Sequence, residues 1–260
     1  MKLGFIGTGE ITKAVILGIT KSKIKYKKII ISKRNSKISS YLKKNNKKIK
    51  ISSDNQFIID NSDWIFLAIT PNVGKKILKN LKFTKNKTII SFISTIKLKE
   101  LKILTNKNAK IVRAIPLPPI SIMKGPIPLF PRNNKVKKFF NNIGDSIETN
   151  DETSSLNFWA TSSLMAPYYE MLHGVAKWLQ KKGLNKLYAQ KYVVSLFSAL
   201  SDAAVMRSNK DLKLLVKTSQ TPKGLNEETL NFLKKKRFLE TIKFIFRKNI
   251  KTFEMIFLCL

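Results

Sequence analysis

Short apolar runs separated by more polar segments occupy the first half of the chain. The runs cover residues 3–6, 27–32, 47–52, 64–69, 87–93 and 109–115. Several are continuously apolar, such as the three isoleucines at 29–31, whereas a strand with one solvated face would alternate with polar residues. Continuous runs of this kind are typical of strands in a sheet that is covered on both faces, so we predict a parallel sheet.

The segments between these runs fit helices. They cover residues 10–20, 36–45, 55–61, 72–81 and 98–104. Regular alternation of strands and helices predicts an α/β fold, and we expect a Rossmann-like, doubly wound domain over residues 1–150. In such a fold the ligand binds beside the carboxyl ends of the strands.

The pattern changes near Asp151, after which no further strand is expected. Apolar residues recur there at three- and four-residue spacing, which predicts helices. The two long helices should cover 154–183 and 185–208, and two shorter ones should cover 225–236 and 239–254. We therefore predict an all-α helical dimerisation domain over residues 151–260.

The first of these long helices carries a wide apolar surface. Its large apolar residues are Phe158, Trp159, Leu164, Met165, Tyr168, Tyr169 and Leu172. A helix this apolar is buried on most of its sides, so we expect the domain to pack against a second copy of itself. The predicted assembly is a homodimer or a higher homo-oligomer.

Composition limits the remaining classes of protein. The 260 residues are 43% hydrophobic, which is typical of a globular protein with a substantial core. Fifty Lys and Arg against sixteen Asp and Glu give a net charge of +34. Such a charge could indicate nucleic-acid binding, but the lysines are scattered along the whole chain instead of forming a tail or stripe, so no specific nucleic-acid partner is expected.

A single cysteine, Cys259, and a single histidine, His173, exclude an intrachain disulfide and a metal site rich in either residue. No metal is therefore expected. The first strand begins at Lys2 or Leu3 with no signal peptide before it, and no apolar run is long enough to span a membrane. We expect a cytoplasmic protein with no membrane partner.

The turn after the first run, Gly7-Thr8-Gly9, contains the first candidate chemistry. Gly7 allows a tight turn, Gly9 lets the backbone approach a diphosphate, and the helix that begins with Glu10 and Ile11 directs free N–H groups at the negative charge. A small residue is usual at position 12, and we expect Thr12 to loosen the contact between helix and strand. Two glycines alone are weak evidence, but their place in a βαβ unit predicts a dinucleotide site.

The end of the second apolar run indicates which dinucleotide binds. A protein that prefers NAD places Asp or Glu there for the ribose 2′-hydroxyl, but this chain has Ser32, Lys33, Arg34 and Asn35. A hydroxyl and two cations suit a 2′-phosphate, which Arg34 could bind in bidentate fashion. Lys is abundant throughout, so Arg34 carries more weight than Lys33. The predicted cofactor is NADP(H).

Five segments occur in the order and spacing of the pyrroline-5-carboxylate reductases, and the chain resembles this family over most of its length. They are GFIGTGEI, SKRN, SDNQFIIDNSDWIFLAITP, VRAIPLPPISIMKG and TSQTPKGLNEETL. The resemblance implies a two-domain fold with a helical dimerisation domain and an NADPH-dependent reduction of 1-pyrroline-5-carboxylate to proline. It also implies a set of cofactor-binding residues, namely Gly7, Gly9, Ser32, Arg34, Asn55, Ala68, Ile69, Thr70 and Pro71.

The departures from the family concentrate on the substrate side. The family has Lys where this chain has Thr70, and Asn and Thr where it has Leu117 and Pro118. The glycines of the family's SGSGPA turn are absent from residues 162–166, and the paired threonines of its SPGGTT loop are absent from residues 221–226. The resemblance places substrate binding at Thr221, Pro222, Lys223 and Gly224.

Hydride transfer to an iminium carbon needs no strong general acid, because that group already carries its proton. Ser163 and Asn226 are the candidate donors to a substrate carboxylate, and Lys223 could pair with the same group. If the substrate is a ketone, His173 is the first candidate acid, although a lone histidine on an apolar helix is commonly a packed core residue. A reductase of another small imine or keto acid and a non-catalytic dinucleotide-binding regulatory protein remain the alternatives.

Overall fold

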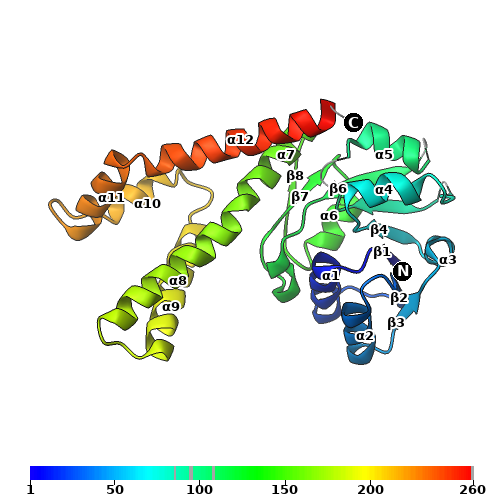
Figure 1. The fold of residues 1–260 in the computed structure, drawn as a ribbon, viewed down its shortest axis with the longest axis horizontal. Coiled ribbons are helices and arrows are strands. Elements are labelled where there is room, and N and C mark those ends of the chain that lie inside the picture. Colours follow the sequence, from blue (N-terminus) through cyan, green and yellow to red (C-terminus); the bar gives the residue numbers. More distant parts are fainter. Residues whose placement is uncertain (85, 94–95, 107–108, 259–260) are drawn as a thin grey trace. The chain divides into compact units, whose positions relative to one another are not determined.

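The computed structural model describes residues 1–84, 86–93, 96–106 and 109–258, with the side chains of 253–258 not described. Cys259 lies outside the described residues. The chain divides into two compact units (Figure 1). Met1–Trp159 forms the body of the first, called the sheet unit, and Ala160–Glu254 forms the second, called the helical unit.

Eight strands form one sheet in the sheet unit. They are β1 Lys2–Ile6, β2 Lys28–Ser32, β3 Ile49–Ser52, β4 Trp64–Leu67, β5 Thr88–Ser91, β6 Lys110–Ala114, β7 Pro126–Phe130 and β8 Asp145–Glu148. Their spatial order is β3-β2-β1-β4-β5-β6-β7-β8, and every neighbouring pair is parallel except β6 and β7. The order reverses between β1 and β4, which is the switch point where a doubly wound sheet opens for a ligand.

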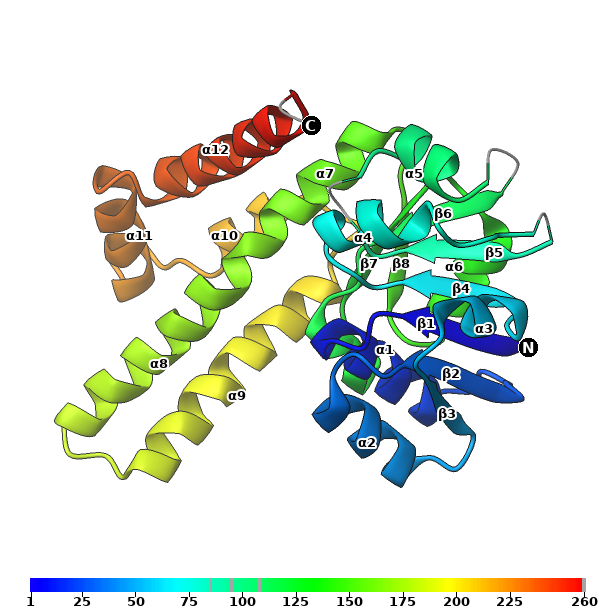
Figure 2. The ribbon, with the colours of Figure 1, turned by 45° about the vertical axis from the view of Figure 1, so that its right-hand side comes forward.

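Helices lie on both sides of this sheet (Figure 2). They are α1 Glu10–Lys21, α2 Ser36–Asn45, α3 Asn55–Asp60, α4 Pro71–Leu78, α5 Leu98–Leu104, α6 Asn134–Phe140 and a 3₁₀ turn η1 Pro118–Ile122. The Rossmann-like, doubly wound prediction is confirmed. The sequence pattern did not predict β7, α6 or β8. Strand β7 contains two prolines, and β8 contains a single apolar residue, Ile147.

The sheet has two separate cores, one on each face. Leu3 and Phe5 of β1 pack with α1, α2 and α6, whereas Ile6 of the same strand packs with α3, α4 and α5. In the first core the rings of Phe5 and Phe66 stack with centroids 4.3 Å apart. Successive strand residues point to opposite faces, which is why these strands are continuously apolar.

A buried ion pair joins β6 to the start of α7, which covers Glu152–Thr161. The guanidinium of Arg113 is 1% exposed and lies 2.7 Å from the Glu152 carboxylate, which also accepts a hydrogen bond from the Leu98 amide. Arg113 further donates to Ser155 and to the Ile96 carbonyl. Burial lowers the pKa of Arg113 below its usual value, and the neighbouring Glu152 opposes that shift. This network fixes the first turn of α7 to the sheet.

The helical unit contains helices throughout its described residues, as predicted. After α7 come η2 Ser162–Leu164, α8 Met165–Lys181, α9 Lys186–Val205, α10 Lys213–Thr218, α11 Leu225–Lys235 and α12 Phe238–Leu258. The single helix predicted over 154–183 is thus interrupted by the 3₁₀ turn η2. Helices α8 and α9 pack together, with the rings of Tyr168 and Phe197 meeting edge to face.

Most large apolar residues of α8 and α9 are exposed within one chain, including Tyr169, Trp178, Tyr188, Tyr192 and Leu200. The apolar surface expected for this region is therefore present, but one chain does not bury it. None of the helices in the described part of the chain combines the length and the hydropathy that crossing a membrane requires.

Candidate functional site

Two adjoining cavities open at the carboxyl ends of β1, β2 and β4, the switch point of the sheet. The smaller, of about 480 Å³, is lined by Ile6, Gly7, Ser32, Lys33, Arg34, Ser53, Asn55, Ile69, Val73 and Ile77. The larger, of about 570 Å³, is lined by Gly7, Thr8, Gly9, Arg34, Asn35, Ser36, Lys37, Ala68, Ile69 and Thr70. Gly7, Arg34 and Ile69 line both, so the two cavities form one site that extends across the glycine turn.

The glycine turn is held by hydrogen bonds to the end of β2. Gly7 has a φ of +102°, and a Cβ on it would lie 2.1 Å from the carbonyl oxygen of Ala68, so only glycine fits. The Gly7 amide donates to the hydroxyl of Ser32 at 3.0 Å, and the Thr8 hydroxyl donates to the Ser32 carbonyl at 2.6 Å. Ser32 therefore fixes the position of the turn through its hydroxyl oxygen and its carbonyl.

Thr12 also stabilises this turn. Its side chain is completely buried, and its Oγ1 donates to the Gly7 carbonyl at 2.7 Å. We expected the larger residue at this position to loosen the contact between α1 and β1. The hydroxyl is instead accommodated by a hydrogen bond that ties the first turn of α1 to the glycine turn.

The amino-terminal end of α1 faces open space. Gly9 is its N-cap and supplies no side-chain hydrogen bond, so the first N–H groups of the helix are left uncapped. A Cβ added to Gly9 would meet no atom within 4 Å, so packing within this chain does not demand glycine there. Glu10 points into solvent with 76% of its side chain exposed, 3.5 Å from the ammonium of Lys13. This geometry suits an anion in front of the helix.

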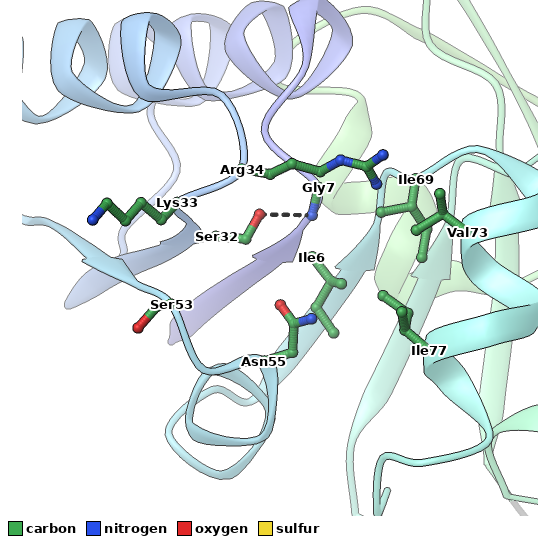
Figure 3. A pocket seen from close by; sticks show the side chains of 10 residues that line it. All are labelled: Ile6, Gly7, Ser32, Lys33, Arg34, Ser53, Asn55, Ile69, Val73 and Ile77. Atoms are coloured by element: carbon green, nitrogen blue, oxygen red, sulfur yellow. Dashed lines mark hydrogen bonds between the residues drawn. The ribbon is translucent and has the colours of Figure 1, made fainter.

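The residues after β2 differ in where they point. The side chain of Arg34 extends across the glycine turn toward Ile69, whereas that of Lys33 extends in the opposite direction (Figure 3). Arg34 has no hydrogen bond or ion pair with any residue that the structure describes. Asn35 uses its Oδ1 to cap α2 by accepting from the Ile38 amide at 3.1 Å.

The smaller cavity has an apolar wall facing polar groups. Ile69, Val73 and Ile77 form one side, while Asn55, at the start of α3, lies on another side (Figure 3). The sequence motifs predicted Asn55 and Ile69 at this site but not Val73 and Ile77. Their four-residue spacing on a helix that begins directly after residues 68–70 was the signal that could have found them.

The structure brings together eleven of the fourteen predicted cofactor residues and leaves three outside the cavity walls. Glu10, Ile11 and Pro71 line neither cavity; they are the first residues of α1 and α4. The lining residues that were not predicted are Ile6, Ser36, Lys37, Ser53, Val73 and Ile77. Among the described residues no group of three or more His, Cys, Asp or Glu could hold a metal ion.

The three predicted catalytic residues lie in the helical unit, each in a different setting. Ser163 in η2 donates to the Ala160 carbonyl at 2.7 Å and accepts from Asn249 at 3.1 Å. Asn226 in α11 donates to the Ser219 carbonyl at 2.8 Å. His173 is exposed within one chain and lines a cavity of about 420 Å³ between α8 and α9.

The sequence and the fold are both similar to those of known proteins. A family model described as NADP oxidoreductase, coenzyme F420-dependent, matches residues 2–95. Pyrroline-5-carboxylate reductase 2 of Bacillus subtilis is 23% identical over 250 residues, 93% of this chain and 90% of that protein. The structure is also similar to 1-pyrroline-5-carboxylate reductase from Streptococcus pyogenes, with a TM-score of 0.83, 22% identity and 98% of both chains covered.

The Plasmodium falciparum pyrroline carboxylate reductase, solved with NADP bound, has a TM-score of 0.83 at 23% identity and covers 98% of this chain and 97% of its own. The likeness thus extends over both units. The chain therefore has the fold of the pyrroline-5-carboxylate reductases and is similar to them over almost its whole length. The positions at which the chain departs from the motifs that it resembles are Thr70 before α4, the β6–η1 connection, and residues of the helical unit.

The loop of residues 221–224, for which substrate binding is predicted, is held by hydrogen bonds within the chain. The Gly224 amide donates to the Thr221 carbonyl at 2.9 Å, and the Lys223 amide donates to Glu227 at 2.7 Å. Lys223 adopts a positive φ of 60°, and Pro222 precedes it. Leu225, where the family has a threonine, is 82% exposed. These hydrogen bonds fix the loop backbone, whereas the Leu225 side chain that follows it is exposed.

Proposed function

We propose that the protein is an NADPH-dependent reductase that converts 1-pyrroline-5-carboxylate to proline. The observation that carries the proposal is the cavity at the β1–β4 switch point. The uncapped start of α1, Gly9 and the Arg34 guanidinium all lie at this cavity. The relatives in Bacillus subtilis and Streptococcus pyogenes support the reaction, because their similarity covers almost the whole chain.

The two adjoining cavities can hold the diphosphate and the adenine of a dinucleotide. The diphosphate would lie against the N–H groups at the start of α1, with Gly9 leaving the space that its approach requires. The adenine would lie in the smaller cavity against Ile69, Val73 and Ile77, where the Arg34 guanidinium could stack on the ring. The Asn55 side chain supplies hydrogen-bonding capacity at the edge of the same cavity.

The cation after β2 favours NADP over NAD. A carboxylate at this place would repel a 2′-phosphate, and residues 32–37 contain none. Arg34 has no partner among the described residues, so binding a phosphate would break no existing ion pair. A guanidinium binds phosphate with two parallel hydrogen bonds, which suits it to this role.

When bound, NADPH supplies a hydride from C4 of its nicotinamide to an electrophilic carbon. The protein then has two tasks, which are alignment of the substrate and neutralisation of its carboxylate. We assign the second task to Ser163, Asn226 and the Thr221–Gly224 loop. Ser163 and Asn226 each have a partner in the free protein, so each exchanges that partner for the substrate.

A second candidate is the reduction of a different small imine or keto acid. Leu164, Met165 and Leu225 replace polar or small residues of the family's substrate motifs, and a buried polar substrate group left without a partner costs about 1–3 kcal/mol. These larger side chains narrow the pocket, so a more apolar substrate that fits the smaller space would restore the match. For a ketone, His173 would supply the proton to the reduced oxygen.

We also propose that the helical unit forms a homodimer. Tyr188, Tyr192, Leu196 and Leu200 are exposed at four-residue intervals along α9, a set called the α9 stripe. An apolar stripe of this kind on a helix is typical of a surface that packs against another helix. A second copy of the same chain is the partner proposed for it.

Purified protein should oxidise NADPH on addition of 1-pyrroline-5-carboxylate, followed by NADPH absorbance and by detection of proline. Calorimetry with NADPH should separately detect binding. Binding without turnover of this imine, but with turnover of another imine or keto acid, would establish the second candidate. Binding with no turnover of any of them would support a non-catalytic role, and no binding would remove the basis of the whole proposal.

A further inference from the structure

Two connections at one edge of the sheet are rich in lysine. One joins α1 to β2 over residues 22–27, and the other joins α2 to β3 over residues 46–48. Both lead into the amino ends of neighbouring strands, because β2 and β3 pair in parallel with Ile29 opposite Ile49. The cofactor cavities lie at the opposite, carboxyl ends of the strands. The two connections are therefore outside the proposed NADPH site.

Contacts between the two connections hold them side by side. The Asn46 side chain donates to the Tyr26 hydroxyl at 2.8 Å, and the Lys48 ammonium lies 5.4 Å from the centre of the Tyr26 ring. The Ile29 amide donates to the Lys48 carbonyl at 3.0 Å. Lysines that are far apart in the sequence are thus gathered on one surface. The exposed lysines of the two connections and of the last turn of α2 are called the lysine patch, namely Lys23, Lys25, Lys27, Lys43, Lys44 and Lys47.

No acidic side chain from the surrounding segment balances the lysine patch. Residues 11–53 contain neither Asp nor Glu. None of the patch lysines forms an ion pair with a residue that the structure describes. Asp63 precedes β4, on the other side of β1, and accepts a hydrogen bond from the Lys2 amide at 2.7 Å. The lysine patch therefore carries positive charge that the protein itself does not neutralise.

The ends of the helices explain only part of this lysine content. Cations in the last turn of a helix are favourable because they offset the negative end of the helix dipole, and Lys43 and Lys44 occupy this place in α2. This effect falls off within one turn. The lysines at residues 23–27 follow the end of α1 at Lys21, and Lys47 follows the end of α2. The helix dipole does not account for these cations of the connections.

The composition of this surface favours a chain of phosphates as its ligand. Tyr41 is the single exposed large apolar side chain in residues 11–53, so the surface offers little to insert into a bilayer or to pack against a protein. Lysine is also depleted at protein–protein interfaces. The segment has one arginine, Arg34, which lines the cofactor cavities. Lysines that contact phosphates bind the backbone and carry no information on base sequence.

We infer that the lysine patch binds the phosphate backbone of a nucleic acid without preference for base sequence. The ammonium groups replace counterions along the backbone, so the affinity falls steeply as the salt concentration rises. The inference does not depend on the proposed reductase reaction. Nucleic acid and NADPH can be bound together, because the lysine patch and the cofactor cavities are at opposite ends of the strands.

Lys25→Gln combined with Lys47→Gln removes one cation from each connection. Lys99→Gln combined with Lys102→Gln is the matched control, because it removes the same charge from two exposed lysines of α5. Fluorescence anisotropy with a labelled single-stranded RNA of about 20 nucleotides would give dissociation constants between about 50 and 200 mM salt. Circular dichroism and thermal unfolding would show that each variant keeps its fold.

The patch variant should raise the dissociation constant for RNA about tenfold at about 150 mM salt. It should also reduce the slope of log affinity against log salt by about 1.4, because two phosphate contacts are lost. The α5 control should stay within about twofold of the unchanged chain in dissociation constant, with the same slope. Lys25→Arg combined with Lys47→Arg keeps both charges and should bind RNA as the unchanged chain does. A second RNA of different base sequence should bind within about twofold of the first.

Equal weakening by the patch variant and the α5 control would overturn the inference, because net charge alone would then explain the binding. Displacement of RNA by saturating NADPH would also overturn it, since RNA would then occupy the cofactor cavity. Binding to vesicles that contain phosphatidylserine, with no binding of RNA at about 150 mM salt, would assign the surface to a membrane instead. Failure of the proposed reductase function is distinguishable, because it would remove NADPH binding or turnover and leave RNA binding unchanged.

Discussion

The sheet unit and the helical unit bury their apolar residues to very different extents. Phe5, Phe66 and Phe140 are fully enclosed between the sheet and its helices. In the helical unit the buried apolar residues among those described are small, namely Ala160, Ala176, Ala189 and Val193. Burial of apolar surface is the main stabilising contribution to folding, so the sheet unit has a sufficient core within one chain. The helical unit lacks such a core among its described residues, which is why we propose a partner surface for it.

This difference predicts how the unfolding free energy of each unit depends on protein concentration. The unfolding free energy of the sheet unit should not change with concentration, because its contacts form within one chain. The unfolding free energy of the helical unit should rise with concentration, because association stabilises the proposed dimer by mass action. Substitutions placed in each unit can therefore test the comparison directly.

Phe66→Ala should have the largest effect. Phe66 is fully buried, stacks on Phe5 and contacts Phe139, so its removal leaves a cavity and should cost about 3–5 kcal/mol of unfolding free energy. Urea unfolding at two protein concentrations that differ tenfold would measure it. The loss should be equal at both concentrations, and a concentration-dependent loss would contradict a core contained in one chain.

Tyr192→Asp should come next. It places a charge in the α9 stripe and should weaken association by about 2 kcal/mol or more, which is the effect of removing an interface hot spot. Analytical ultracentrifugation should detect a shift toward monomer. Ser198→Asp adds the same charge to the same helix at an exposed polar position and should leave the mass unchanged. Monomer formation by both variants to the same degree would remove the α9 stripe from the proposed interface.

Thr12→Val should have an intermediate effect confined to the sheet unit. It removes the hydrogen bond to the Gly7 carbonyl and should cost about 1–2 kcal/mol, with weaker binding of NADPH as a result. Thr12→Ser retains the hydroxyl and should retain more of the NADPH affinity. Calorimetry and ultracentrifugation together would show whether binding falls while the dimer persists. Equal NADPH affinity in both variants would show that the hydroxyl does not support the site.

Glu148→Gln should have the smallest effect, and it should depend on pH. The hydrogen bond from the Lys137 ammonium holds the pKa of Glu148 below its usual value. Burial of the carboxylate raises this pKa, and a hydrogen bond from the Asn133 amide opposes that rise. The stabilisation is thus present above the ordinary pKa of Glu and is lost as pH falls through the lowered folded value. The variant should be less stable by under about 1 kcal/mol at pH 7 and should approach the original chain at pH 3. A difference that persists unchanged at pH 3 would exclude the ionic origin.

The sequence was most informative where one physical constraint controls the residues. Continuous apolar strands predicted the sheet because burial on both faces leaves few alternatives, and Gly7 marked the turn because no other residue fits beside the Ala68 carbonyl. Strand β7 escaped prediction because Pro126 and Pro128 are unfavourable in strands, although this strand pairs with β6 and β8.

The cofactor cavity was predicted in outline, but the tasks of its residues were not. Ser32 is predicted to contact the cofactor, and in the structure its hydroxyl also accepts a hydrogen bond from the Gly7 amide, a contact that depends on the three-dimensional turn. Val73 and Ile77 were missed because apolar residues on α4 are equally expected for core packing. For Ser163 and Asn226 the catalytic assignment stays a prediction that measured turnover has to decide.

The open surroundings of Gly9 have a practical consequence. At a φ of −99° any amino acid can occupy this position, and a side chain there would project into space that no other part of this chain occupies. Gly9→Val should therefore give a well-folded protein that no longer admits the diphosphate. Such a variant would let a geneticist separate loss of chemistry from loss of the protein itself within a living cell.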